Sequence, residues 1–329
     1  MKRLRFWLGI GISIICLALA VKDVRFADVL AALQGANYAL LLITILLTVV
    51  GMAARAMRWQ LLFYPQRGLP FPRFFTVINI GYLLINVLPA RLGDVARAYL
   101  LGALIGVSKA RTLSTIIVER VTDVLVILLF LATLVFIMPV PDWVAQSGTL
   151  LAAGFVSLAV LLVLLARFRD TGLRLMHRIV RFVPWLDREA LWHLVDSLID
   201  GLVILRYWRP ALALLVGSIF IWLLSVLQFY SVMEAFGLAL PITAAVLVLC
   251  VTALGMTVPS SPGYIGVWEY IIVLVLSLFG VDKSRALSCA LVLHATVYLT
   301  TTALGVLSLW RESLAMAILR EEVLPEGKS

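Results

Sequence analysis

The chain has 329 residues, of which 63% are hydrophobic and only 14% charged, and its formal net charge is +9. This apolar composition excludes a soluble domain and indicates a polytopic membrane protein. Beside membrane spans, a surplus of lysine and arginine serves topology and anionic headgroups, so no nucleic-acid partner is expected.

The N-terminal region, residues 1–37, is predicted to form a first helix and an interfacial segment. Three basic residues precede the apolar run at 6–21, as in a signal peptide, but no small-residue cleavage pattern follows. We therefore expect a retained helix with its N-terminus inside. The mixed sequence at 21–38 is amphipathic and is expected to lie along the outer interface.

Residues 38–140 are predicted to form a first repeat. A helix over 38–57 ends near Arg55 and Arg58, which is a cytoplasmic signature. The next apolar run is interrupted at 86–101 by the sequence NVLPARLGDVARAYLL. Because Pro89 removes a backbone donor and Gly93 loosens the following turn, a broken or re-entrant helix is expected there. A helix over 113–138 completes the unit.

Residues 141–209 are expected to hold a linking helix and a cytoplasmic amphipathic connector, since arginines outnumber acids at 167–209 and alternate with apolar residues at helical spacing. Residues 210–310 form a predicted second repeat, which is interrupted at 256–269 by MTVPSSPGYIGVWE. Residues 311–329 then form a cytoplasmic tail, so both termini are expected inside.

The two interruptions match at a nearly constant offset. Pro89 and Gly93 recur 170 positions later as Pro259 and Gly263, and the Lys-x-Arg at 109–111 recurs 174 positions later at 283–285. The alternative is that apolar sequence aligns by chance, but matched proline, lysine and arginine favour a repeat. The predicted topology places the two units in opposite orientations. We therefore expect an all-α polytopic membrane protein of two inverted repeats with broken or re-entrant helices, the architecture of carriers.

Three ordered motifs carry a family resemblance. LPARLGDVARAYLL at 88–101, ER-x-x-D at 119–123 and VPSSPGYIGVWE at 258–269 resemble the lysylphosphatidylglycerol synthetase transmembrane-region family, the flippase-like membrane domain of multiple-peptide-resistance factors. The likeness covers residues 38–310. Members with the full enzyme carry a soluble aminoacyl-transferring domain after the membrane region, whereas residues 311–329 follow here. Resemblance to a stand-alone member without that synthase domain implies translocation of a lipid without its synthesis.

Arg91 and Arg97 are the predicted binding residues for a headgroup phosphate, because a guanidinium offers a fork of donors to its oxygens. The alternative for both is interfacial anchoring. In the second interruption, Ser260, Ser261 and Gly263 are predicted to present hydroxyls and backbone amides to headgroup oxygens. The alternative for this stretch is a simple turn between spans.

A supporting charge network is predicted from ionisable residues in apolar segments, where unpaired charge is costly. Its predicted members are Asp94, Glu119, Arg120, Asp123 and Glu269. The alternative is a purely structural network. Glu269 is expected in the first turn of a helix, stabilised by the helix dipole or paired with an arginine of the other half.

Three further aromatic residues have simpler interpretations. His294 is interpreted as a packed, hydrogen-bonded side chain rather than a proton relay. Tyr264 and Trp268 are interpreted as residues of an interfacial belt.

No metal site, cofactor or enzymatic activity is expected. The three cysteines are far apart, and no nucleophile elbow, P-loop or metal-spaced cluster is present in the sequence. The expected function is flipping of a phospholipid or lipid-linked anionic molecule across the inner (cytoplasmic) cell membrane, with lipid-biosynthesis proteins as possible partners. A membrane-embedded transferase acting on a polyprenyl-linked donor, and a non-transporting subunit of a lipid-synthesis complex, remain as alternatives.

Overall fold

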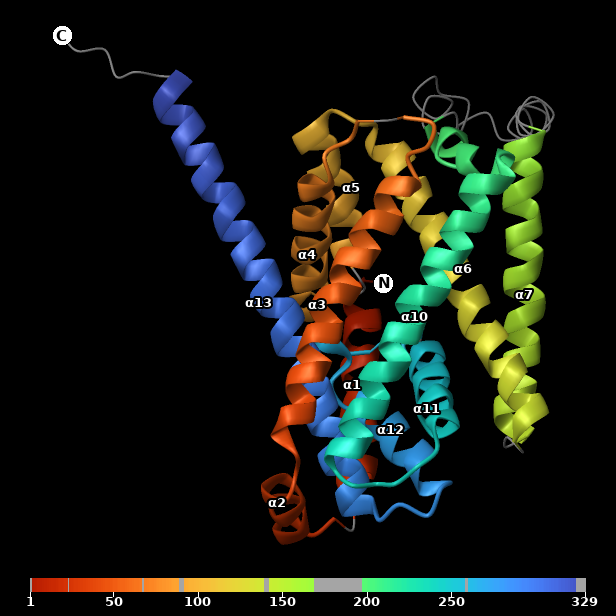
Figure 1. Ribbon diagram of the computed structural model, residues 1–329, viewed down its shortest axis with the longest axis vertical. Coiled ribbons are helices and arrows are strands. Elements are labelled where there is room, and N and C mark those ends of the chain that lie inside the picture. The colour runs from red at the N-terminus through yellow and green to blue at the C-terminus, as the bar shows by residue number, and fades with distance from the viewer. Residues whose placement is uncertain are drawn as a thin grey trace.

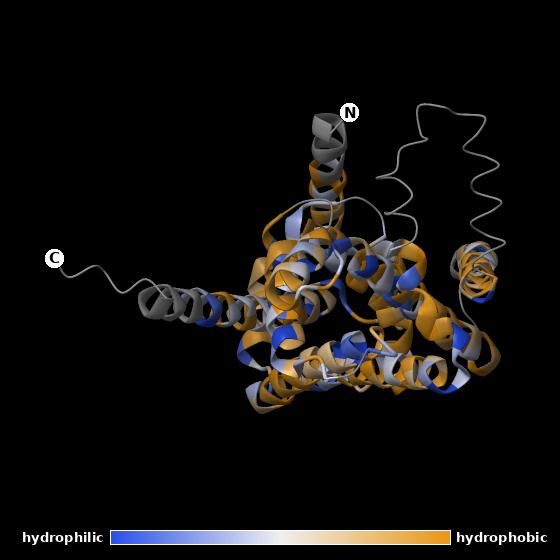
Figure 2. Cartoon of the chain, turned by 90° about the horizontal axis from the view of Figure 1, so that it is seen from above, coloured by the Kyte–Doolittle hydropathy of each residue, from blue (hydrophilic) through white to orange (hydrophobic). Residues whose placement is uncertain are grey.

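The computed structural model describes residues 2–22, 24–66, 68–88, 92–138, 142–168, 197–257 and 260–323. Within these ranges the chain forms helices and no strand (Figure 1), which confirms the all-α prediction. Five of the described helices are long and apolar enough to cross a membrane. The helices are mainly hydrophobic along their length (Figure 2), so the chain is a multi-pass membrane protein.

The described helices include two series of four with the same order of long and short members. Two helices precede them, α1 (Lys2–Val21) and α2 (Phe26–Gln34). The first series is α3 (Tyr38–Leu61), α4 (Phe71–Val87), α5 (Leu92–Ile105) and α6 (Lys109–Ile137). The second is α10 (Trp208–Ala235), α11 (Ile242–Gly255), α12 (Val267–Ser277) and α13 (Lys283–Val323), with the short η3 (Pro262–Tyr264) before α12. Between the series lie α7 (Asp142–Arg167) and the short η2 (Val203–Arg206).

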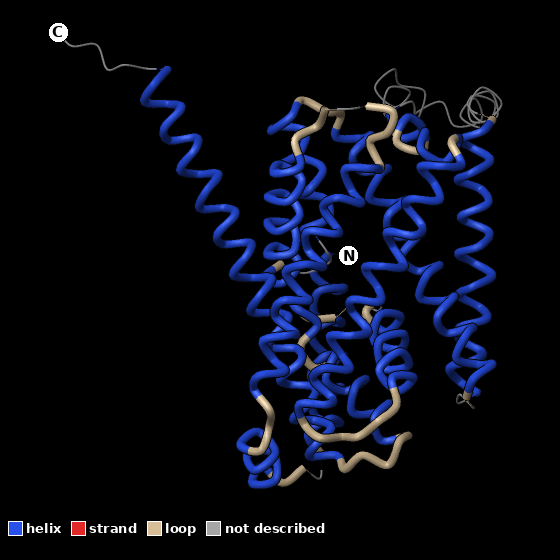
Figure 3. The backbone as a smooth tube through the Cα atoms, viewed as in Figure 1, coloured by secondary structure: helices blue, strands red, loops and turns tan. Residues whose placement is uncertain are grey.

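The short helices of each series pack against each other as a hairpin. In Figure 1, α4 and α5 occupy the upper half of the bundle, and α11 and α12 occupy the lower half. A helix of 14 residues, the length of α5 and α11, is about 21 Å long, which is short of a hydrocarbon core of about 30 Å. Figure 3 shows loop segments at mid-height as well as at both ends of the bundle. Each hairpin therefore enters from one end and turns back inside.

The two long helices that begin the series exchange reciprocal contacts. Arg58 of α3 donates from Nη1 to Oγ of Ser218 on α10 at 2.8 Å. Gln228 of α10 donates from Nε2 to Oγ1 of Thr48 on α3 at 3.3 Å. Arg58 and Gln228 are 170 positions apart, as are Thr48 and Ser218. A contact repeated with its two sides exchanged is what a pseudo-two-fold axis produces, so this pairing supports the predicted repeat.

The arginines matched in the sequence also occupy matching places. Arg111 donates from Nη2 to the carbonyl oxygen of Phe63 at 3.0 Å, and Arg285 donates from Nη2 to that of Phe236 at 2.8 Å. The two carbonyls lie at the C-terminal ends of α3 and α10, where helices leave carbonyl groups without partners. Inversion of the two series stays a prediction, to which these contacts lend support.

Several predicted element limits differ from the structure. The helix predicted to end at 57 continues to Leu61, since Arg58 finds buried acidic partners inside the bundle. The predicted outer turn at 139–148 is already helical from Asp142. The first part of the predicted tail, 311–323, continues α13, because neither glycine nor proline follows Gly305 until Pro325. Most of the predicted connector, 169–196, lies outside the described residues.

A disulfide cross-link tests the packing of α3 on α10. Oγ1 of Thr44 and Oγ of Ser231 lie 2.8 Å apart. In a background with the native cysteines replaced by alanine, Thr44→Cys with Ser231→Cys should form a disulfide on mild oxidation, because two γ-atoms this close place the Cβ atoms within bonding reach. Mass spectrometry of linked peptides measures it.

The matched control pairs Thr44→Cys with Ser218→Cys. Ser218 lies 13 positions before Ser231 on the same helix, which is about 20 Å along the axis, so this pair should not link. Equal linking of both pairs would contradict the helix register described here.

Candidate functional site

The centre of the buried charge network is Glu119 on α6. Its carboxylate accepts hydrogen bonds from both terminal nitrogens of Arg97 on α5, with Nη1 at 3.1 Å from Oε1 and Nη2 at 2.9 Å from Oε2. The Arg97 side chain has no exposed area, and that of Glu119 is 3% exposed. This two-pronged pairing is the strongest geometry available to a guanidinium and a carboxylate.

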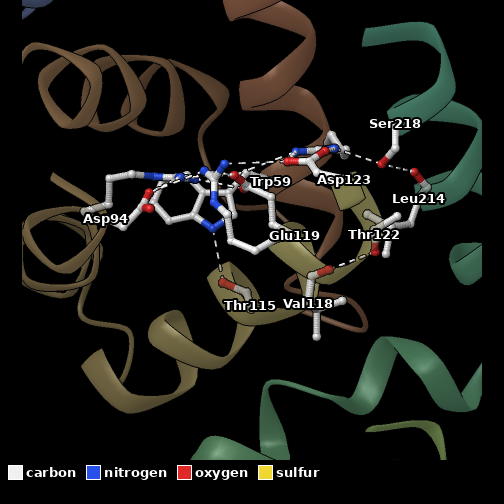
Figure 4. A network of polar contacts seen from close by, with 12 residues as sticks. Trp59, Asp94, Thr115, Val118, Glu119, Thr122, Asp123, Leu214 and Ser218 are labelled. Atoms are coloured by element: carbon white, nitrogen blue, oxygen red, sulfur yellow. Dashed lines mark hydrogen bonds and ion pairs between the residues drawn. The ribbon is translucent and has the colours of Figure 1, made fainter. Parts of the chain in front are cut away.

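One turn further along α6, Asp123 pairs with Arg58 of α3. Both terminal nitrogens of Arg58 donate to this carboxylate, and Nη2 also lies 3.7 Å from Oε1 of Glu119. The indole N–H of Trp222 donates to Oδ1 of Asp123 at 3.1 Å, which joins α10 to the network. Figure 4 shows the polar chain from Asp94 through Glu119 and Asp123 to Ser218.

Arg120 closes the network on the side of α5. Its Nη2 donates to Oε1 of Glu119 at 2.7 Å and to Oδ1 of Asp94 at 3.3 Å, and its Nη1 lies 3.7 Å from Oδ2 of Asp123. Among the described residues, the network therefore joins three arginines to three carboxylates, and the formal charges of these six residues cancel. Proteins tolerate buried charges when each charge has a partner of opposite sign and is hydrogen-bonded, as these charges are.

Two glycines make room for Arg97. A Cβ on Gly81 of α4 would lie 2.5 Å from Cγ of Arg97, and a Cβ on Gly93 of α5 would lie 2.1 Å from the carbonyl oxygen of Gly81. Both distances are too short for a side chain, so glycine lets α4 and α5 approach closely. The Arg97 guanidinium lies over the ring of Trp59, 4.2 Å from the ring centroid.

The two series of helices share an internal cavity of about 230 Å³. Polar and aromatic lining residues from the first series are Arg55, Tyr82, Asn86, Asp94, Arg120 and Asp123. Those from the second series are Trp222, Ser225, Gln228, Phe229, Thr252, Thr257, Tyr264, Trp268, His294, Tyr298 and Thr301, and Gly263 also lines the cavity. Tyr298 also donates its hydroxyl to the carbonyl oxygen of Asn86 at 3.3 Å, near the inner end of α4. Gly263 of the second interruption lies beside the same carbonyl group, since a Cβ on Gly263 would be 3.4 Å from the Asn86 oxygen. The second interruption thus meets the inner end of α4, as the repeat predicts.

Arg55 is a cavity residue that sequence reasoning missed. Its guanidinium carbon lies 5.9 Å from the centroid of the Tyr82 ring and 5.5 Å from that of Trp222. It makes no hydrogen bond or ion pair with any residue that the structure describes. Since the network beside it is balanced, Arg55 adds one uncompensated positive charge to the cavity. The sequence interpretation treated it as a topology signal.

Glu269 lies apart from this network. As predicted, it is in the first turn of α12, where Oε2 accepts the backbone N–H of Gly266 at 2.7 Å. Its partner, however, is His294 of the same series and not an arginine of the other half: Nδ1 of His294 lies 2.5 Å from Oε1 of Glu269. Nε2 of His294 lies 2.9 Å from the carbonyl oxygen of Gly263. The packed, hydrogen-bonded histidine of the sequence interpretation is confirmed.

Of the remaining predicted binding residues, some line the cavity and others do not. Arg91 lies outside the described residues. Gly263 lines the cavity, whereas Ser260 and Ser261 are not among its described lining residues. The amide of Ser261 is already used, since it donates to Oγ of Ser13 on α1 at 2.8 Å.

Trp268 is not the belt residue that the sequence suggested. It stacks on His294, with ring centroids 5.0 Å apart and an interplanar angle of 17°. Its Nε1 and the Oγ1 of Thr252 are buried without a hydrogen-bond partner, and both residues line the cavity. Buried polar atoms in proteins are almost always satisfied, so this cavity is suited to a polar guest. The described residues hold no cluster of metal-ligating side chains.

Known proteins resemble nearly the whole chain. Residues 6–305 match the family model described as the lysylphosphatidylglycerol synthase TM region. Two UPF0104 membrane proteins of Methanothermobacter thermautotrophicus are 28% and 26% identical, over 93% and 90% of this chain and 92% of each relative. A UPF0104 membrane protein of Methanocaldococcus jannaschii is 22% identical over 77% of this chain and 76% of its own length. The family match is consistent with a lipid-related role in a membrane.

Removing the charge of Glu119 should destabilise the protein. Glu119→Gln leaves the buried guanidinium of Arg97 without its main counter-charge, so the free energy of unfolding should fall by about 3–5 kcal/mol. Unfolding of the detergent-solubilised protein, followed by circular dichroism against denaturant, measures the loss.

The control breaks a half-exposed ion pair. Arg73 and Glu312 pair at 2.7 Å, and their side chains are 39% and 18% exposed. Glu312→Gln should therefore cost only about 0–1 kcal/mol. A Glu119→Gln protein as stable as this control would show that the network is not a stabilising element.

Proposed function

The chain belongs to the family of lysylphosphatidylglycerol synthase transmembrane regions, and we propose that it moves a phospholipid or lipid-linked anionic molecule across the membrane. The observation that carries this proposal is the cavity between the two hairpins, with Arg55 facing it and lacking a carboxylate partner among the described residues. An uncompensated cation at membrane depth is costly unless an anion or water reaches it. A headgroup phosphate supplies that anion.

Arg55 and Arg120 are the proposed headgroup residues. Both line the cavity, and Arg120 keeps 29% of its side chain exposed although it pairs with the network. The Arg55 guanidinium lies over the rings of Tyr82 and Trp222, and these ring contacts leave its N–H donors available for phosphate oxygens.

Headgroup binding by Arg91 and Arg97 stays a prediction. In our proposal Arg55 and Arg120, rather than these two residues, make the main contacts with the headgroup. Arg97 is fully buried and already holds Glu119, Asp94 and the Trp59 ring. In our proposal Asp94, Glu119 and Asp123 orient the arginines of the network and balance their charge when the cavity is empty.

The size of the cavity favours a headgroup path rather than a pocket for a whole lipid. Its volume of about 230 Å³ lies below the range of about 300–1,000 Å³ that encloses drug-sized ligands. The acyl or prenyl tail then stays in the surrounding lipid while the headgroup crosses. Hairpins that enter from opposite ends (Figure 1) provide the elements that alternate in exposing the cavity to the two leaflets.

The proposed setting is the inner cell membrane with both termini cytoplasmic, since two basic residues lie where α6 begins, namely Lys109 and Arg111. The proposal contains no covalent step. Partner proteins of lipid biosynthesis are compatible with it and are not needed by it.

Neutralising Arg55 should slow lipid exchange. In proteoliposomes that contain fluorescent phosphatidylglycerol, Arg55→Gln should lower the exchange rate between leaflets about tenfold or more, because loss of one charged hydrogen-bond pair costs roughly 1.5–3 kcal/mol. Arg55→Lys should restore part of the rate, since lysine keeps the charge but lacks the fork. Loss of a labelled-lipid signal to an external quencher measures exchange.

Arg73→Gln is the matched control, because Arg73 pairs with Glu312 at the surface and does not line the cavity. Wild-type exchange by folded Arg55→Gln would refute the assignment. The same vesicles separate the alternatives: a new covalent lipid product, detected by mass spectrometry, would identify a transferase, and absence of both exchange and product would favour a non-transporting subunit.

A further inference from the structure

The second interruption holds a buried histidine whose two ring nitrogens both face hydrogen-bond acceptors. Nδ1 of His294 faces Oε1 of Glu269 at 2.5 Å, and Nε2 faces the carbonyl oxygen of Gly263 at 2.9 Å. A carbonyl oxygen only accepts, so the second contact needs a hydrogen on Nε2. The ring thus holds the interruption through one nitrogen and the start of α12 through the other.

To make both contacts, the His294–Glu269 pair must hold one proton more than a neutral imidazole and an ionised carboxylate hold together. With the Nε2 hydrogen donated to Gly263, a neutral ring presents a lone pair at Nδ1, and the Glu269 carboxylate presents lone pairs as well. At 2.5 Å they repel unless a proton lies between them, on the ring or on the carboxyl group. Loss of that proton breaks one of the two contacts.

The pair is enclosed but has a route for a proton. The side chains of His294 and Glu269 are 10% and 4% exposed. The Trp268 ring stacks on the imidazole, and the Tyr298 ring meets its edge with centroids 5.9 Å apart. His294 also lines the cavity, so a proton reaches it by the path of the proposed headgroup.

Other charged or titratable groups from neighbouring elements line the same cavity as His294. They are Arg55 on α3, Tyr82 on α4, Asp94 on α5, Arg120 and Asp123 on α6, and Tyr264 on η3. Asp94, Arg120 and Asp123 belong to the network whose charges cancel. Among the described charged residues that line the cavity, Arg55 is the one outside this network.

We infer that Glu269 and His294 form a proton-binding site that sets the conformation of the second hairpin, so that a proton and an anionic headgroup occupy the cavity together. Without the proton, the pair carries one negative charge and offsets Arg55. With the proton, the pair is neutral and Arg55 needs another anion. The empty and the doubly occupied cavity are therefore both neutral, whereas either guest alone leaves a charge that is costly at membrane depth.

Among its described residues, the first hairpin has no equivalent switch. Arg97 and Glu269 are 172 positions apart, and Glu119 and His294 are 175 apart, close to the offsets of the repeat. In the first series this place holds an arginine and a glutamate, a pair that stays charged because arginine does not lose its proton. Proton binding therefore acts on one interruption and leaves the other fixed.

The coupling has a definite sign. Proton binding strengthens anion binding, and by reciprocity an anion strengthens proton binding to the same degree. Affinity for an anionic headgroup should therefore rise as the pH falls. The headgroup part of this inference rests on the proposed function, whereas the proton site rests on hydrogen-bond geometry alone.

Binding of short-chain phosphatidylglycerol to the purified protein tests the coupling. At about pH 6 the wild type should bind it about fivefold or more tightly than at about pH 8, because fivefold is the lower end of typical coupling between two binding sites. Short-chain phosphatidylcholine, which carries no net charge, should show no such change. Glu312→Gln serves as the control variant and should keep the wild-type dependence.

Two variants of the pair should behave in opposite ways. Glu269→Gln supplies an amide donor to Nδ1, as a protonated carboxyl does, so it should bind phosphatidylglycerol tightly at both pH values. His294→Gln removes the imidazole and leaves the charge of the Glu269 carboxylate to offset Arg55, so this variant should bind weakly at both. Persistence of the wild-type pH dependence in either variant would overturn the assignment.

Tryptophan fluorescence without lipid provides a separate readout of the proton site. Because Trp268 stacks on His294, wild-type emission should change between about pH 5 and about pH 9, the range in which histidine changes charge, and Trp268→Phe should remove the change. No such change in the wild type would overturn the proton site. A change without phosphatidylglycerol binding at any pH would keep the proton site but overturn both its coupling to a headgroup and the proposed function.

Discussion

Burying a charged side chain inside a membrane costs free energy unless the charge is paired. In this structure the carboxylate of Glu119 provides most of that pairing. Arg97 binds it with two hydrogen bonds, Arg120 donates a third, and Arg58 lies within ion-pair distance. These partners come from α3, α5 and α6, so one side chain joins three helices. Because lipid gives apolar helices little reason to prefer one another, polar contacts of this kind decide which helices pack together.

The same contacts make the two hairpins unequal. The first is joined to α6 through ion pairs of Arg97, and its helices approach at Gly81 and Gly93, where no larger residue fits. The second is held at its interruption by hydrogen bonds of His294 to Gly263 and Glu269. The first hairpin is thus held by ion pairs that keep their charge, whereas the hydrogen bonds that hold the second hairpin depend, in our inference, on a bound proton. In the proposed mechanism, this difference predicts that the second hairpin moves more readily than the first.

The sequence predicted much of the fold, because proline, glycine and charged residues stand out in apolar segments. Both interruptions, the clustering of Asp94, Arg97, Glu119, Arg120 and Asp123, and the family were predicted on those grounds. Arg55 and Arg58 were misjudged, because basic residues near a helix end satisfy the positive-inside rule equally well whether they face lipid headgroups or a cavity. The partner of Glu269 was missed for another reason: a neutral-looking histidine 25 positions later gives no signal of pairing, which depends on how α12 packs against α13.

Helix α7 has a consequence for how the chain is threaded through the membrane. In Figure 1, α3 rises and α6 descends, so the first series starts and ends at the lower end, whereas α10 starts the second series from the upper end. One further crossing is needed between them, and α7 is the described helix that makes it. Most of its described side chains are exposed, and its main contacts are with α6 and η2. Its contribution is therefore a change of direction: α7 returns the chain to the upper end, so the second series starts in Figure 1 from the end opposite to the first.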